Sequence, residues 1–207
     1  MEINVASYGQ LNDNHLNRIK ETLTKSLNEY PRTMIVRADL FLPDEQLNND
    51  STLITRFIAS LKAQMLSDLF RRMTAGKRVH SCKMRYVWAR EFCQSGKKHY
   101  HVALFFNKDT YAYPGTYRCS DEGTWRQNLS LMIMEAWVRT LRLDKQDNYQ
   151  KNYAYVNFPG RGYIHLNKVR NSFEGDYADA MNWICYLAKE YSKDNTDGQR
   201  NFGCSQF

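Results

Sequence analysis

The chain is 207 residues long, with 43% hydrophobic and 14% aromatic residues and a net charge of +7. This composition is typical of a globular protein with one sizeable core, and it excludes a disordered chain. The five cysteines form no CxxC pair, which argues against a zinc ribbon or a disulfide framework. No run of about 18 apolar residues predicts a membrane span, so we expect a soluble intracellular protein.

The first part of the chain predicts two helices around one strand. Apolar residues at helical spacing predict a helix over 13–28. This helix would form an N-terminal arm, residues 1–30, packed on a main domain of residues 31–207. Residues 33–43 are typical of a strand that ends at a proline. An apolar stripe then predicts a long helix that begins near residue 51 and ends at about Met73.

The second part of the chain predicts strand pairs between helices. Two strands over 82–93 and 99–107 are joined by the short turn "QSGKK". The next expected elements are a helix over 124–141, a hairpin over 153–168, a helix over 172–191 and a polar tail. This alternation predicts an α+β fold with a central antiparallel sheet and packed helices. A ferredoxin-like or RRM-like core fits this order, and other α+β arrangements fit it as well.

Positive charge is concentrated between Arg71 and Lys98. This segment contains nine lysines and arginines but a single acid, Glu91. Such a concentration indicates a polyanionic partner, most simply nucleic acid. The alternative is a basic face that is only solvated.

The stretch "HYHVALFF", residues 99–106, predicts a metal-binding pair. Side chains two residues apart point to the same face of a strand, so His99 and His101 project together. Glu91 lies on the preceding strand, and an antiparallel hairpin would bring it beside the histidines. Two imidazoles and one carboxylate form a ligand set for a divalent ion. The alternative is a pair of histidines that only decorate an exposed strand.

The last predicted helix contains a tyrosine outside its packing stripe. At about 100° per residue, Tyr186 lies about 200° from Ile184, which belongs to the stripe, and Lys189 lies about 140° from it. A phenol beside an ammonium group is a plausible nucleophile, because the positive charge favours the phenolate. The alternative is an ordinary exposed tyrosine.

Together these motifs resemble a known family. A His-hydrophobe-His strand followed much later by Tyr-x-x-Lys resembles the HUH endonucleases, in the motif order of rolling-circle replication initiators. The segments "WAREF", "HYHVALFF", "YLAK" and "RNFGCS" are similar to those of inovirus-type (filamentous phage gene II-like) replication proteins of phages and prophages. The resemblance covers roughly residues 30–205, most of the chain.

The resemblance implies a mechanism and a set of site residues. His99, His101 and Glu91 would hold Mg²⁺ or Mn²⁺ at the scissile phosphate of single-stranded or hairpin origin DNA. Tyr186 would attack the phosphate and form a 5′-phosphotyrosyl link, with help from Lys189. The expected DNA contacts are Arg37, Lys83, Arg85, Arg90, Lys97 and Lys98. Such a protein would act in the cytoplasm of a bacterial host, with a host helicase as partner and without a membrane.

The chain departs from the family at one motif, and other functions stay open. The candidate upstream strand, "IVRADLF", lacks the usual threonines, so Asp39 has no specific assignment, and Arg37 has none beyond the expected DNA contact. One alternative is a non-catalytic regulator that binds single-stranded nucleic acid by stacking and phosphate contacts. Another is a different metal-dependent hydrolase that uses the histidine pair.

Overall fold

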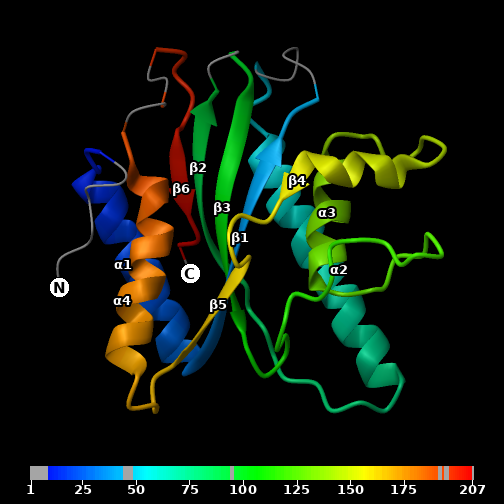
Figure 1. The fold of residues 1–207 in the computed structure, drawn as a ribbon, viewed down its shortest axis with the longest axis horizontal. Coiled ribbons are helices and arrows are strands. Elements are labelled where there is room, and N and C mark those ends of the chain that lie inside the picture. The colour runs from blue at the N-terminus through cyan, green and yellow to red at the C-terminus, as the bar shows by residue number, and fades with distance from the viewer. Residues whose placement is uncertain (1–8, 44–48, 94–95, 191–192, 194–195, 207) are drawn as a thin grey trace.

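A computed structural model of the chain describes residues 9–43, 49–93, 96–190, 193 and 196–206. It contains one antiparallel sheet of six strands with helices on both faces (Figure 1). The elements in chain order are α1 (Asp13–Glu29), β1 (Arg32–Phe41), α2 (Leu53–Thr74), β2 (Arg85–Phe92), β3 (Lys98–Asn107), α3 (Leu129–Thr140), the 3₁₀ helix η3 (Tyr149–Tyr155), β4 (Val156–Asn157), β5 (Tyr163–Asn167), α4 (Phe173–Ile184), the 3₁₀ helix η4 (Cys185–Ala188) and β6 (Phe202–Cys204). The predicted α+β class is confirmed.

The strand order explains how distant segments meet. The sheet runs β4-β1-β3-β2-β6, and β5 also pairs with β1. The connection β1–α2–β2–β3–α3–β4 with this order is the split βαβ arrangement of ferredoxin-like folds. β1 and β3 therefore lie at the centre of the sheet, where residues from both can share a face.

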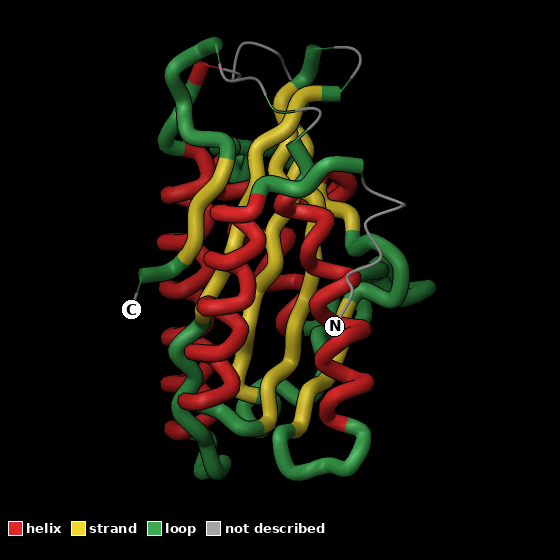
Figure 2. The backbone as a smooth tube through the Cα atoms, turned by 90° about the vertical axis from the view of Figure 1, so that its left-hand side faces the viewer, coloured by secondary structure: helices red, strands yellow, loops and turns green. Residues whose placement is uncertain are grey.

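Side chains of the central strands point alternately to the two faces of the sheet, and each face carries its own core. Met34, Val36, Ala38 and Leu40 of β1 face α2 and α3, together with Tyr100, Val102, Leu104 and Phe106 of β3. The alternate residues Ile35, Ala103 and Phe105 face α1, α4 and η4. Figure 2 views the molecule from the side of α1 and α4, whose helices run in front of the strands. The face that contains the histidines is thus a second covered face rather than an exposed one.

The predicted hairpin over 153–168 is wrong. β4 and β5 do not pair with each other but both pair antiparallel with β1, through Asp39↔Asn157 and Val36↔Tyr163. The "PGRG" segment between them bulges out of the edge, and its Gly162 carbonyl accepts a hydrogen bond of 3.1 Å from the Arg37 amide. Gly160 and Gly162 have φ values of 60° and 73°, which glycine adopts without strain, so the chain bends there without reversing.

Three further boundaries differ from the sequence-based expectation. α3 begins only at Leu129, because the Asn128 side chain accepts a 2.9 Å hydrogen bond from the Leu131 amide and caps the helix there. The last α-helix ends at Ile184 and continues as the 3₁₀ turn η4, and residues 191–192 lie outside the described part. The tail, expected to be only polar, adds β6 to the edge of the sheet beside β2.

The N-terminal helix is part of the second core. Ile19 and Leu23 of α1 are fully buried, and Leu27 is nearly so. They pack against the sheet and η4 as one cluster, so α1 covers the sheet rather than extending from it. In the described part of the chain, no helix combines the length and the apolar content needed to cross a bilayer.

Candidate metal and tyrosine site

The strand register brings three predicted side chains together. In the antiparallel pair of β2 and β3, Glu91 lies opposite His99 and Ala89 lies opposite His101. In the pair of β1 and β3, Asp39 lies opposite His101. All these residues point to the face covered by α1, α4 and η4. The site therefore lies on three adjacent strands of the sheet.

The distances within the cluster suit one shared cation. The Nε2 atoms of His99 and His101 are 3.1 Å apart, and His101 Nε2 is 3.3 Å from Glu91 Oε2. One ligand atom from each of these three residues can be chosen so that all three lie within 4.8 Å of one another. Ligands at about 2.1 Å and 90° in an octahedral site would be separated by about 3 Å. The spacing of these three donors thus fits a single divalent cation.

Asp39 is a site residue that the sequence left without a role. Its Oδ1 accepts a 2.6 Å hydrogen bond from His101 Nδ1, and its Oδ2 is 3.3 Å from the Asn157 amide nitrogen. This contact keeps a proton on Nδ1 and directs Nε2 of His101 toward Glu91 and His99. A carboxylate behind a ligating histidine is a recurrent arrangement in metal sites. One feature of the sequence could have identified Asp39: it is an acidic residue two positions after Arg37 on a largely apolar strand.

Tyr186 of η4 and Lys189, which directly follows η4, face this cluster. The ammonium group of Lys189 donates hydrogen bonds to the Tyr186 hydroxyl and, at 2.8 Å, to Glu91 Oε2. The rings of Tyr186 and His101 meet edge to face, with centroids 4.9 Å apart. Side chains three residues apart eclipse in a 3₁₀ turn, which explains why Tyr186 and Lys189 point the same way. The phenol therefore lies beside the candidate metal ligands.

Arg37 completes the surroundings of the tyrosine. Its guanidinium carbon lies 4.8 Å from the centroid of the Tyr186 ring and 5.5 Å from that of Trp183. Arg37 Nη1 also donates a 2.9 Å hydrogen bond to the Trp183 carbonyl. Since Arg37 is 6% exposed, it supports the tyrosine ring and the end of α4 from inside the protein.

The electrostatic field of the site favours positive charge between its carboxylates. Burial works against ionisation of Glu91, but hydrogen bonds from His101 and Lys189 outweigh it and lower the Glu91 pKa to about 2. Burial likewise acts to lower the pKa of His101, but Asp39 and Glu91 outweigh it and raise that pKa. A position that stabilises an imidazolium in this way also suits a divalent cation.

Lys189 is only one of the groups that determine the pKa of Tyr186. Burial raises the pKa of Tyr186, and the hydrogen bond from Lys189 lowers it. The pKa nevertheless stays above its ordinary value, because burial is the larger effect. The phenol is therefore protonated in the resting site, and Lys189 only reduces the cost of ionising it.

The basic residues expected to contact DNA separate into two groups. Lys83 and Lys97 are exposed, as the prediction requires. The structure instead places Arg85, Arg90 and Lys98 in buried internal contacts. Arg85 pairs with Glu29, Arg90 binds Asp197 and Asn201, and Lys98 donates to the Asp50 carbonyl. Arg37, which was also predicted to contact DNA, is likewise buried, against Tyr186 and Trp183. These four cations support the fold, so they do not belong to an exposed phosphate-binding row.

The N-terminal segment holds the backbone of Lys189. Leu11 forms an antiparallel bridge with Lys189. On either side, the Asn12 amide donates a 2.8 Å hydrogen bond to the Ala188 carbonyl, and the Glu190 amide donates one of 3.1 Å to the Gln10 carbonyl. The turn that presents Tyr186 and Lys189 is thus attached to the start of α1.

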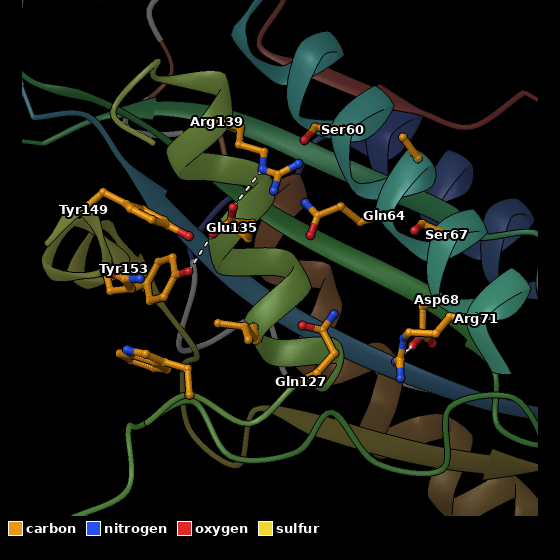
Figure 3. A pocket seen from close by; sticks show the side chains of 14 residues that line it. Ser60, Gln64, Ser67, Asp68, Arg71, Gln127, Glu135, Arg139, Tyr149 and Tyr153 are labelled. Atoms are coloured by element: carbon orange, nitrogen blue, oxygen red, sulfur yellow. Dashed lines mark hydrogen bonds and ion pairs between the residues drawn. The ribbon is translucent and has the colours of Figure 1, made fainter. Parts of the chain in front are cut away.

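A polar cavity of about 500 Å³ lies in the opposite helical layer, between α2, α3 and η3 (Figure 3). Its acid Glu135 accepts hydrogen bonds from Arg139 Nε at 2.8 Å and from the Tyr153 hydroxyl at 2.6 Å. The second acid, Asp68, pairs with Arg71. Both carboxylates are neutralised within the protein, so this cavity adds no reactive group to the site on the other face.

The similar proteins and the matching family model point to the same family. The chain is 37% identical over 201 residues to the protein named "Uncharacterized protein YfjJ" from Escherichia coli (strain K12), with 91% of this chain and 92% of that protein covered. It is 35% identical over 198 residues to "Uncharacterized protein YagK" of the same strain, with 91% and 90% covered. No solved structure matches significantly. The family model for the YagK/YfjJ C-terminal domain matches residues 2–205, and the chain belongs to this family.

Proposed function

We propose that this protein is a metal-dependent endonuclease that nicks and rejoins single-stranded DNA at a replication origin. The observation that carries the proposal is the position of Tyr186 and Lys189 against the cluster of Glu91, His99 and His101, with the Tyr186 and His101 rings 4.9 Å apart. A nucleophile beside a candidate metal site is the arrangement that phosphoryl transfer to a side chain requires.

The site residues have distinct tasks in this reaction. His99, His101 and Glu91 would hold Mg²⁺ or Mn²⁺, which would supply Lewis-acid stabilisation to the scissile phosphate. The Tyr186 oxygen forms a bond to phosphorus and its proton leaves to solvent, while Lys189 stabilises the developing phenolate. The bond from phosphorus to the 3′ oxygen breaks, and that oxygen takes up a proton as the free 3′-OH.

The phosphotyrosyl link conserves the energy of the phosphodiester. A 3′-OH can later attack the same phosphorus, restore the DNA strand and release Tyr186 without ATP. This reversible chemistry suits the initiation of rolling-circle replication in a phage or related mobile element. It would take place in the cytoplasm of a bacterial host, and a separate host helicase would unwind the duplex.

The proposal is tested with purified protein and a short single-stranded oligonucleotide that bears an origin-like hairpin from the source replicon. With Mn²⁺, a covalent protein–DNA adduct is expected on a denaturing gel, and Tyr186→Phe should abolish it. Tyr177→Phe is the matched control, because Tyr177 lies on α4, is partly buried against the second core, and is not one of the residues of the metal and tyrosine site.

Two outcomes would contradict the proposal. An adduct that persists in Tyr186→Phe would show that another residue is the nucleophile. Binding of the oligonucleotide without any metal-dependent cleavage would favour the non-catalytic regulator instead.

A further inference from the structure

The helix α2 has an apolar stripe that nothing in the described structure covers. Leu66, Phe70 and Met73 are exposed to 71%, 70% and 62%. Their spacing of i, i+4 and i+7 places them on one side of the helix. The side of α2 that packs against the sheet, through residues such as Leu61 and Met65, lies about 100–150° around the helix from this stripe. The lower turns of α2 extend beyond α3 (Figure 1).

A shallow hollow lies beside this stripe. It has a volume of about 260 Å³ and lies between α2 and the segment that leads into β2. Met65, Leu69 and Met84 line its apolar part, and Leu66 forms part of its edge. A concave apolar hollow next to a helical stripe is the shape into which a side chain of a partner helix inserts.

The rim of this surface is basic. Lys62 and Lys83 line the hollow on opposite sides. Lys77 and Arg78, both exposed, follow directly after the end of α2 near Met73. The nearby acid Asp68 is 4% exposed and pairs with Arg71, so its charge is compensated within the protein. An occupant of the stripe would therefore meet four exposed cations.

We propose that this surface binds an acidic amphipathic helix of a partner protein. The surface consists of the stripe of Leu66, Phe70 and Met73 and the rim of Lys62, Lys77, Arg78 and Lys83. Apolar residues of that helix would cover the stripe, and its Asp and Glu residues would face the rim. A second copy of this chain fits poorly, because a symmetric contact would bring the same cations together. A lipid surface offers no side chain to fill the hollow.

The docking surface is independent of the proposed nuclease site. α2 lies on the opposite face of the sheet from His99, His101 and Tyr186. Both surfaces can therefore be occupied at once. The nicking assay on Phe70→Ser is expected to give the wild-type result.

A library of helical peptides displayed on phage, selected on the purified protein, tests the proposal. We expect the enriched peptides to have apolar residues at i, i+3 or i+4 and i+7 and a net negative charge. For a synthetic copy of an enriched peptide, Phe70→Ser should raise the Kd at least about tenfold in fluorescence anisotropy. Added salt should also raise the Kd, because the rim is exposed.

The control variant is Val169→Ser, which removes an isolated apolar side chain that is 81% exposed. It should leave the Kd of the peptide unchanged. The proposal is overturned if no peptide is enriched or if the enriched peptides are not acidic. It is also overturned if Phe70→Ser binds the enriched peptide as tightly as Val169→Ser does. It is also overturned if light scattering shows a dimer that Phe70→Ser dissociates, or if phosphatidylglycerol vesicles bind the wild type but not Phe70→Ser.

Discussion

His101 connects every part of the candidate site. Its Nδ1 contacts Asp39, its Nε2 lies near both Glu91 and His99, and its ring meets Tyr186. Alternation along the strand predicted that both histidines share a face, and the hairpin predicted Glu91 beside them. The role of Asp39 was not predictable in this way, because it depends on the register between β1 and β3. These strands are separated by a long helix and by β2, so no local pattern specifies their alignment.

Replacement of Asp39 tests its contact with His101. Asp39→Asn removes the negative charge that favours the Nδ1–H tautomer and the cation at Nε2. We expect the Kd for Mn²⁺ to rise by about 10- to 100-fold, measured by isothermal titration calorimetry. Asp109→Asn is the control, because that aspartate pairs with Arg32 outside the cluster. An unchanged Kd in Asp39→Asn would show that Asp39 does not orient a metal ligand.

At the scale of elements, the largest difference between the predicted and the observed structure lies in the C-terminal part of the chain. Helical spacing predicted one α-helix over 172–191, whereas η4 replaces its last turn. Tyr186 and Lys189 still point together, since a separation of three residues aligns side chains in both helix types. β6 was missed because three residues around a glycine give too short a pattern. Its position comes from tertiary contact with β2.

Gly203 allows β6 to lie against Trp88. A Cβ atom on Gly203 would lie 2.6 Å from Trp88 Cε2, closer than any unstrained contact. We expect Gly203→Ala to lower the free energy of unfolding by about 1–3 kcal/mol, since the indole or β6 must shift. The measurement is urea denaturation followed by circular dichroism.

Gly175→Ala is the matched control for this experiment. Gly175 lies in α4, and a Cβ atom added there would meet nothing within 4 Å. Alanine favours a helix interior over glycine by about 1 kcal/mol, so this variant should be neutral or more stable. Equal effects of the two substitutions would contradict the steric explanation for Gly203.

At the scale of the whole molecule, one sheet separates two cores with different contents. The face toward α2 and α3 is apolar along its central strands, as the run of Tyr100, Val102, Leu104 and Phe106 predicted. The other face combines an apolar half with the charged site. The sequence predicted α1 as an arm. Its apolar stripe indicates that the helix packs on another part of the protein, but the stripe does not identify that part. The segments that α1 contacts most, η4, β2 and β6, are far away along the chain.

Leu23 tests whether α1 belongs to the core. Leu23→Ala leaves a void between α1 and the sheet, so we expect the free energy of unfolding to fall by about 2–5 kcal/mol. Leu66→Ala on the exposed stripe of α2 should change it by less than about 0.5 kcal/mol. Thermal or chemical denaturation of both variants provides the comparison. A negligible effect of Leu23→Ala would favour a detachable arm.

The pairing of residues 10–12 with the segment around Lys189 has a consequence for synthesis. The ribosome synthesises Leu11 before His99 and His101, and Lys189 after them. A nascent chain that has already formed β1, β2 and β3 therefore has its candidate ligands but neither Tyr186 nor the contact that anchors Lys189. Translation products that end before Tyr186 would therefore lack the residue proposed as the nucleophile.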